Sequence, residues 1–160
     1  MPTFYLDTSA VFKRYVLERG TVFARELFDR AIAADRLTTS RLTAVELEAI
    51  AACAVRARVL SQEEYGTLLA WFALDLKNVL FIAPVTDATM FEAARIARTY
   101  GLRAPDAIHL ATARLVRETT HSGLIFVSSD RELLTAARED TFTVLDPEDD
   151  PALATLRALR

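Results

Sequence analysis

Four acidic residues lie where the sequence predicts an active-site crevice, and two of them follow predicted strands. Asp7 comes directly after the apolar run at 4–6, and Asp130 comes shortly after the apolar run at 124–127. In an open parallel sheet, ligands bind outside the carboxyl ends of the strands, so both carboxylates should point into that crevice. Either aspartate alone is more often a helix cap, but two of them on strands that can be neighbours carry more weight.

The other two acids belong to predicted helices. Asp106 begins the apolar helix expected at 105–118. Either the helix dipole alone favours an aspartate there, or the helix holds Asp106 at the same crevice. Glu46 lies between apolar residues of the helix expected at 41–58, which can place it on the inner face of that helix. Glu48 lies two positions further on and is expected to point into solvent.

Short apolar runs alternate with helical patterns along the chain. The predicted strands cover residues 4–6, 37–39, 79–82, 124–127 and 142–145. The predicted helices cover residues 10–18, 21–35, 41–58, 61–76, 87–100, 105–118 and 131–139. This alternation indicates an α/β fold with a mainly parallel sheet of four to five strands, flanked by about seven helices on both faces. We expect one domain at 1–146 and a C-terminal tail at 147–160 that can form a short helix.

Cap residues indicate where the predicted helices begin and end. Thr8 or Ser9 is expected to cap the first helix, and Gly20 is expected to end it. Ser61, followed by Glu64 three residues later, predicts a capping box at the start of the fourth helix.

The four segments that contain the acids form an ordered set. They read YLDTS at 5–9, S…VE at 40–46, PDAIHLA at 105–111 and VSSDREL at 127–133. In order and overall length this set resembles the PIN-domain family, and within it the small VapC-type toxins of bacterial and archaeal toxin–antitoxin pairs. The resemblance covers about the whole chain, and its strongest parts are the strand followed by DTS and the segment PDAIHLATA.

The resemblance implies a Mg²⁺- or Mn²⁺-dependent ribonuclease with a PIN-like sheet and acids at its C-terminal edge. By motif position, the catalytic acids are Asp7, Glu46, Asp106 and Asp130. The hydroxyls at the family's accessory positions are those of Thr8 or Ser9, and of Ser128. The resemblance also implies an RNA substrate, a cognate antitoxin that binds the toxin and occludes its site, and a homodimer.

The chemistry of the side chains supports this interpretation independently. Mg²⁺ and Mn²⁺ prefer oxygen ligands, and the sequence has no cysteine or histidine pair at the spacing of a zinc site. Two ions about 4 Å apart can activate water and stabilise the leaving oxygen during phosphodiester hydrolysis. Asp7 and Asp106 are expected to hold the ions, with Asp130 as a further ligand and Glu46 completing the site. His109 is expected to be a packed or hydrogen-bonded residue and not a base.

Composition limits the remaining possibilities. The chain has 160 residues, 52% hydrophobic and 26% charged, which excludes a disordered, collagen-like or disulfide-rich protein. A single cysteine, no signal-peptide pattern and no apolar run of about 20 residues favour the cytoplasm. The net charge of −3 argues against binding nucleic acid by bulk charge alone. The basic residues that can border the acidic pocket are Lys13, Arg14, Arg41, Arg103 and Arg131.

Two other functions share part of this pattern of residues. A haloacid-dehalogenase-type phosphatase also has an aspartate after its first strand, but it requires a second one two residues later, where this chain has Ser9. It also requires a lysine near its later motifs, and only Lys13 and Lys77 exist. A non-catalytic PIN module that only binds RNA or protein would usually have lost one or more acids, and all four are present.

Overall fold

The structure, a computed structural model, describes residues 2–33, 35–120 and 123–159. In this part of the chain, five parallel strands form one sheet in the order β3-β2-β1-β4-β5. The strands are β1 (Thr3–Leu6), β2 (Arg36–Ser40), β3 (Leu80–Ala83), β4 (Leu124–Val127) and β5 (Thr143–Leu145). The predicted α/β fold with a parallel sheet is confirmed, and β1 is its central strand.

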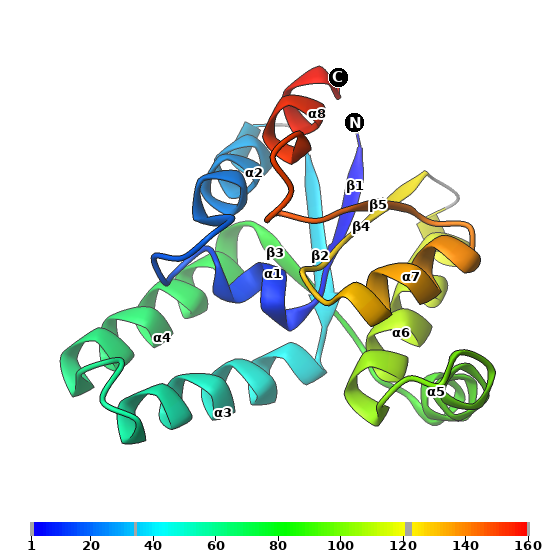
Figure 1. Ribbon diagram of the computed structural model, residues 1–160, viewed down its shortest axis with the longest axis horizontal. Helices are drawn as coiled ribbons and strands as arrows, with labels where there is room; N and C mark the ends of the chain where they lie inside the picture. Colours follow the sequence, from blue (N-terminus) through cyan, green and yellow to red (C-terminus); the bar gives the residue numbers. More distant parts are fainter. Residues whose placement is uncertain (1, 34, 121–122, 160) are drawn as a thin grey trace.

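Eight helices in the described residues cover both faces of the sheet (Figure 1). They are α1 (Thr8–Phe12), α2 (Thr21–Ala33), α3 (Leu42–Arg56), α4 (Gln62–Asn78), α5 (Asp87–Tyr100), α6 (Ala104–Thr120), α7 (Arg131–Glu139) and α8 (Ala152–Ala158). The first four and α8 contribute to one hydrophobic cluster, and α5, α6 and α7 contribute to the other. None of the described helices combines the length and the apolarity that crossing a membrane requires.

The central strand shows how the sheet divides the core. Successive side chains of a strand point to opposite faces, so Phe4 and Leu6 enter one cluster together with Phe28 of α2. Tyr5 enters the other cluster together with Leu110 of α6. All of these side chains are fully buried. Burial on both faces explains why the strand reads as a continuous apolar run and does not alternate with polar residues.

The first helix differs from its expected bounds at both ends. Neither Thr8 nor Ser9 is its cap: Asp7 occupies the cap position, and its side chain accepts a hydrogen bond from the Ala10 backbone N–H. The helix then ends at Phe12 instead of continuing to residue 18. The expected cap was wrong because the first polar residue after the strand is the aspartate itself, whose carboxylate accepts from the helix N-terminus equally well.

A buried ion pair explains the early end of α1. The Lys13 side chain is almost fully buried, and its Nζ donates to Glu18 Oε1 at 3.0 Å and to Glu148 Oε1 at 2.6 Å. In a continuous helix, residues five apart do not face each other, so the chain must turn for Glu18 to reach Lys13. Gly20, with a φ of +88°, follows this turn, and a Cβ there would approach the Lys13 side chain and Pro147 to 2.9 Å.

The predicted capping box is confirmed, and the end of the chain forms a further helix. Ser61 and Glu64 form the capping box at the start of α4. The C-terminal segment forms α8, whose Leu156 is fully buried, and Arg30 Nη2 of α2 donates to the Leu159 carbonyl oxygen at 2.8 Å. Arg160, the last residue of the expected tail, lies outside the described residues.

Candidate active site

Parallel pairing of β1 with β4 brings two acid-bearing strand ends together. Leu6 is in register with Val127, and the Asp7 backbone N–H donates to the Val127 carbonyl oxygen at 3.1 Å. Asp7 and Ser128 are therefore the first residues beyond the paired strands, side by side at the C-terminal edge of the sheet. The two strands that carry Asp7 and Asp130 are therefore neighbours in the sheet, as the sequence analysis required for the two aspartates to form one site.

The Asp7 carboxylate is buried and held on both oxygens. Its Oδ1 accepts from Ser9 Oγ at 2.7 Å and from the Ala10 backbone N–H at 2.9 Å, and its Oδ2 accepts from Ser128 Oγ at 2.6 Å. Only 5% of the residue is exposed. Burial raises the pKa of Asp7, against the opposing influence of His109 and of these three hydrogen bonds. A carboxylate in this environment is stabilised by a nearby positive charge.

The segment after β4 connects Asp7 to Asp130. Ser128 Oγ, which donates to Asp7, also accepts from the Asp130 backbone N–H at 3.0 Å. Ser9 Oγ likewise accepts from the Ser129 backbone N–H at 3.0 Å. Asp130 itself caps α7, with its Oδ1 accepting from the Leu133 backbone N–H at 2.9 Å. Asp130 is thus a helix cap and a member of the acidic site at once, because its Oδ2 points to a different partner.

That partner is Arg103, which bridges Asp130 to Asp106. Arg103 Nη2 donates to Asp130 Oδ2 at 3.3 Å, and Arg103 Nε donates to Asp106 Oδ2 at 3.1 Å. Asp106 lies in the first turn of α6. Burial raises the pKa of Asp106, Arg103 opposes this, and the charges of Asp130 and Asp7 raise it further. Asp7, Asp106 and Asp130 therefore form one electrostatically coupled group.

Glu46 lies beside this group in a separate hydrogen-bond network. It projects from α3, and its Oε2 accepts from Thr8 Oγ1 and contacts His109 Nε2 at 2.8 Å. Burial acts to raise the pKa of Glu46, but the contacts with His109 and Thr8 outweigh it and lower the pKa. Thr8 directly follows Asp7 in the chain, so the residue that donates to Glu46 is the immediate neighbour of the buried aspartate. Glu48 points elsewhere, as expected, and accepts from Tyr65 Oη at 2.7 Å.

The five basic residues expected to border the pocket fall into two groups. Arg103 contacts the acids, and Arg41 and Arg131 are exposed at the starts of α3 and α7. Lys13 is buried in its pairs with glutamates, and Arg14 pairs with Asp75 and Asp29. The expectation that Lys13 borders the pocket is therefore wrong, because its ammonium group is already neutralised inside the fold.

The site can be compared with what a divalent cation requires. Among the described residues, no three histidine, cysteine, aspartate or glutamate side chains are placed to hold one ion as they stand. The donor chemistry nevertheless fits Mg²⁺ or Mn²⁺, because Asp7, Asp106 and Asp130 offer carboxylate oxygens. A cationic group, the Arg103 guanidinium, already lies between two of them. The Ser129 hydroxyl oxygen nearby is buried and has no hydrogen-bond partner in the described structure.

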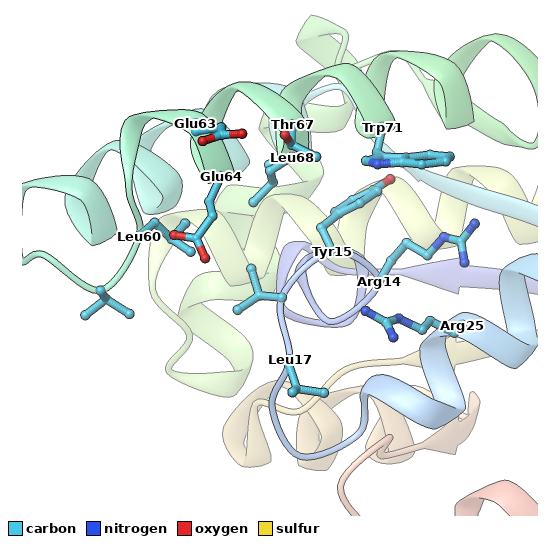
Figure 2. Close-up of a pocket in the computed structure, with 12 residues that line it drawn as sticks. Arg14, Tyr15, Leu17, Arg25, Leu60, Glu63, Glu64, Thr67, Leu68 and Trp71 are labelled. Atoms are coloured by element: carbon cyan, nitrogen blue, oxygen red, sulfur yellow. The ribbon is translucent and has the colours of Figure 1, made fainter.

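A groove that none of the four acids lines runs between α4 and the loop after α1 (Figure 2). Its volume is about 750 Å³. Tyr15 and Leu17 of the loop and Trp71 of α4 supply apolar surface, and the Leu17 side chain is 85% exposed. Arg25 and Glu63 add charges of both signs. This groove is therefore separate from the acidic site.

Sequence reasoning anticipated two of the three further residues at the acidic site. Arg103 is among the basic residues expected to border the pocket, and it contacts Asp106 and Asp130. His109 is expected to be packed or hydrogen-bonded, and it is buried and bonded to Glu46. The buried hydroxyl of Ser129 gave no signal, because its burial depends on how the segment after β4 packs.

The fold and the position of the acids define the class of protein. The chain matches the PIN domain family over residues 4–139, a range that includes all four acids, and it belongs to that family. It is 32% identical, over 154 residues, to proteins named Ribonuclease VapC45 and Ribonuclease VapC49 from Mycobacterium tuberculosis. These alignments cover 94% of this chain and 100% of each relative. The family predicted from the four motifs is confirmed.

Solved structures show the same fold at lower sequence identity. PAE2754 from Pyrobaculum aerophilum superposes with a TM-score of 0.59 at 20% identity, covering 98% of this chain and 96% of that one. VapBC-1 from nontypeable Haemophilus influenzae gives a TM-score of 0.62 at 15% identity, covering 92% and 99%. FitAB bound to an IR36 DNA fragment gives 0.58 at 19% identity, covering 91% and 96%. These similarities establish the fold alone.

Proposed function

We propose that the protein is a metal-dependent endoribonuclease and the toxin of a toxin–antitoxin pair. The observation that carries this proposal is the buried Asp7 at the end of the central strand, coupled to Asp106 and Asp130. Relatives named VapC ribonucleases, aligned over nearly the whole chain, support the same activity. Neither alternative has support, because Ser9 stands where a phosphatase requires an aspartate and no acid has been lost.

The three coupled aspartates are the proposed metal ligands. When bound, Mg²⁺ or Mn²⁺ would neutralise charge on the scissile phosphate and lower the pKa of water. Hydrolysis forms a bond from a water oxygen to phosphorus and breaks the bond from phosphorus to one ribose oxygen, which takes up a proton. Ser9 and Ser128 hold the Asp7 carboxylate in place, so little reorganisation is required during reaction.

Glu46 is the proposed fourth catalytic acid. Thr8 and His109 hold only its Oε2, and no hydrogen bond in the described structure engages Oε1. Its pKa is lowered, so the carboxylate is ionised at neutral pH and can accept a proton or a hydrogen bond from water. Arg41 and Arg131, exposed at the same edge of the sheet, are positioned to contact RNA phosphates.

A cognate antitoxin is the proposed protein partner. One structure with this fold is described as a toxin–antitoxin complex from Klebsiella pneumoniae. The groove in Figure 2 has the size, apolar surface and mixed charge that suit an amphipathic helix of such a partner. From there, a tail of the antitoxin would reach the acidic site and occlude it. We further propose that the toxin acts in the cytoplasm as a homodimer, which light scattering of the purified protein can test.

The nuclease is tested with purified protein and a generic single-stranded RNA. Cleavage should require Mg²⁺ or Mn²⁺, stop with EDTA and be lost in Asp7→Asn, because an amide cannot replace an anionic ligand. Glu118→Gln is the matched control, since Glu118 is exposed about 18 Å along α6 from Asp106. Cleavage that persists in EDTA, or in Asp7→Asn, contradicts the proposal.

The toxin role requires a separate test. Expression of the wild-type protein without its partner should slow growth of its own host, and Asp7→Asn should not. Co-expression of the antitoxin should restore growth. Normal growth in the presence of active wild-type nuclease would contradict the toxin role and leave the nuclease chemistry standing.

A further inference from the structure

The buried His109 is bonded on both ring nitrogens to residues of three other elements. Its Nε2 lies 2.8 Å from Glu46 Oε2 of α3 and 3.1 Å from Thr8 Oγ1 of α1. Its Nδ1 lies 2.9 Å from Tyr5 Oη of β1. Only 2% of the histidine is exposed, and Tyr5 is fully buried. Both ring nitrogens of this buried imidazole are therefore satisfied, and each is tied to a different element of the fold.

The partners determine which nitrogen carries the proton. The Glu46 carboxylate, whose pKa is lowered, can only accept, so Nε2 must donate to it. Burial raises the pKa of Tyr5 well above its ordinary value, so its hydroxyl keeps its proton and can donate to Nδ1. A histidine with a proton on Nε2 therefore satisfies its contacts with both Glu46 and Thr8. The arrangement is directional, running from the Tyr5 hydroxyl through the imidazole to the Glu46 carboxylate.

These hydrogen bonds connect His109 to the acidic site through Glu46. His109 lies three residues after Asp106 on α6, so the same helix supplies a proposed metal ligand and the partner of Glu46. Arg103, which contacts Asp106 and Asp130, is also among the charges that lower the pKa of Glu46. Glu46 is therefore held at the border of the aspartate group, with its Oε1 available to the site.

We propose that His109 is a positioning residue that, fixed by Tyr5, orients the Glu46 carboxylate for RNA hydrolysis. This role rests on the proposed nuclease function and adds a residue to it. Hydrogen-bonding partners that orient active-site ligands typically contribute 10–100-fold to activity. Because His109 acts through Glu46 and not through RNA, its loss should lower kcat and leave KM for RNA unchanged.

Three variants of His109 and its partner separate positioning from packing. His109→Leu keeps apolar volume and removes the donor. His109→Gln retains an amide N–H close to the place of Nε2 and should recover most of the activity. Tyr5→Phe keeps the ring and removes the hydroxyl that orients the imidazole. Leu110→Ala is the control for destabilisation, since Leu110 is fully buried on the same helix and makes only apolar contacts.

The kinetic test is a double-mutant cycle with Glu46→Gln. His109→Leu should lower kcat about 10–100-fold in wild type and cause little further loss in the Glu46→Gln background. Leu110→Ala should lower the melting temperature without this dependence on Glu46. Multiplicative effects of His109→Leu and Glu46→Gln, or a KM increase that accounts for the loss, would overturn the proposal.

A spectroscopic test does not depend on activity. The chain has two histidines, so the imidazole ¹⁵N signals of His109 are assigned by their absence in His109→Gln. We expect a proton on Nε2 in wild type, with the Nε2 signal shifted in Glu46→Gln and the Nδ1 signal shifted in Tyr5→Phe. A ring protonated on Nδ1 alone, or signals unchanged in both variants, would overturn the proposal. If these signals behave as expected but no RNA is cleaved, the proposed function fails and the hydrogen-bond chain stands.

Discussion

The acidic site and the groove differ in nearly every physical property. The acidic site is built from buried or half-buried carboxylates held by hydrogen bonds, as Asp7 is by Ser128. The groove is built from apolar side chains left exposed, such as Leu17 and Trp71. Buried, prearranged charges suit chemistry on a phosphate, whereas exposed apolar surface suits a protein partner. The two regions should therefore respond to different mutations.

The largest effect should come from Asp7→Asn. We expect a loss of RNA cleavage of at least about 10²–10³-fold, similar to the loss of one electrostatic stabiliser in other enzymes. Because the acids act as a unit, Asp7→Asn combined with Asp106→Asn should be little worse than either alone. Binding of the antitoxin segment that docks at the groove, without the tail that would cover the acids, should be unchanged, which calorimetry on the variant can check. Weaker binding of this segment would show that the two regions are not independent.

Divalent metal should stabilise the acidic site and leave the groove unaffected. At a hundredfold excess over its dissociation constant, Mg²⁺ or Mn²⁺ should add about 2.7 kcal/mol to the free energy of unfolding. Asp106→Asn should gain much less, while its metal-free melting temperature should rise because repulsion from Asp130 and Asp7 is relieved. Thermal melts in EDTA and in metal measure both quantities. Equal metal shifts in wild type and variant would place the ion elsewhere.

The groove should respond to changes that leave cleavage untouched. Trp71→Ala together with Leu17→Ala should weaken antitoxin binding by about 30-fold, the usual cost of truncating a central aromatic contact. Cleavage of RNA by the free toxin should stay at the wild-type rate. Val22→Ala is the matched control, because Val22 is an exposed apolar residue of α2 that does not line the groove. If Val22→Ala weakened antitoxin binding equally, the antitoxin would dock on a surface other than this groove.

A smaller effect concerns pH in the absence of metal. The folded-state pKa of Asp106 is raised, so the native state binds protons more tightly than the unfolded chain. Its contribution to stability is complete at low pH and is lost as pH rises through the carboxylate range. Glu46, with a lowered pKa, acts in the opposite direction. The stability of wild type relative to Asp106→Asn should therefore fall from acidic to neutral pH, as denaturant titrations can measure.

The smallest expected effect comes from Arg103→Gln. Removing the guanidinium frees Asp106 and Asp130 for an ion, but exposed ion pairs contribute only about 0–1 kcal/mol. We expect Mn²⁺ to bind up to about fivefold more tightly, as measured by calorimetry. Arg131→Gln, which removes an exposed arginine at the start of α7, should leave the affinity unchanged. Weaker binding in Arg103→Gln would show that the arginine supports the ion instead of competing with it.

Much of the acidic site follows from local sequence. Asp7 and Asp130 could be placed because parallel strands end at one edge of the sheet, whatever their order. That β1 pairs with β4, which makes Ser128 a direct partner of Asp7, depends on the sheet order and could not be predicted from the separate segments. The contact of Glu46 with His109 depends on how α3 and α6 pack, which no periodicity encodes.

The groove was not predicted at all. It exists because α1 ends at Phe12 and the chain turns around Lys13, which leaves Leu17 exposed opposite α4. The turn is stabilised by Glu148, more than 130 residues away in sequence. Helical propensity alone favoured continuing the helix, and a long-range buried ion pair overrode it.

Asp7 and its partner Ser128 are 121 residues apart in sequence, so they can meet only after most of the chain has been synthesised. The first strand can pair with β4, and the Asp7 carboxylate can gain its second anchor, only after more than 120 residues have been made. Contacts this distant in sequence form late, and a nascent chain on the ribosome lacks them until translation is nearly complete. If the proposed nuclease function is correct, the chain would gain its complete acidic site only near the end of its own synthesis.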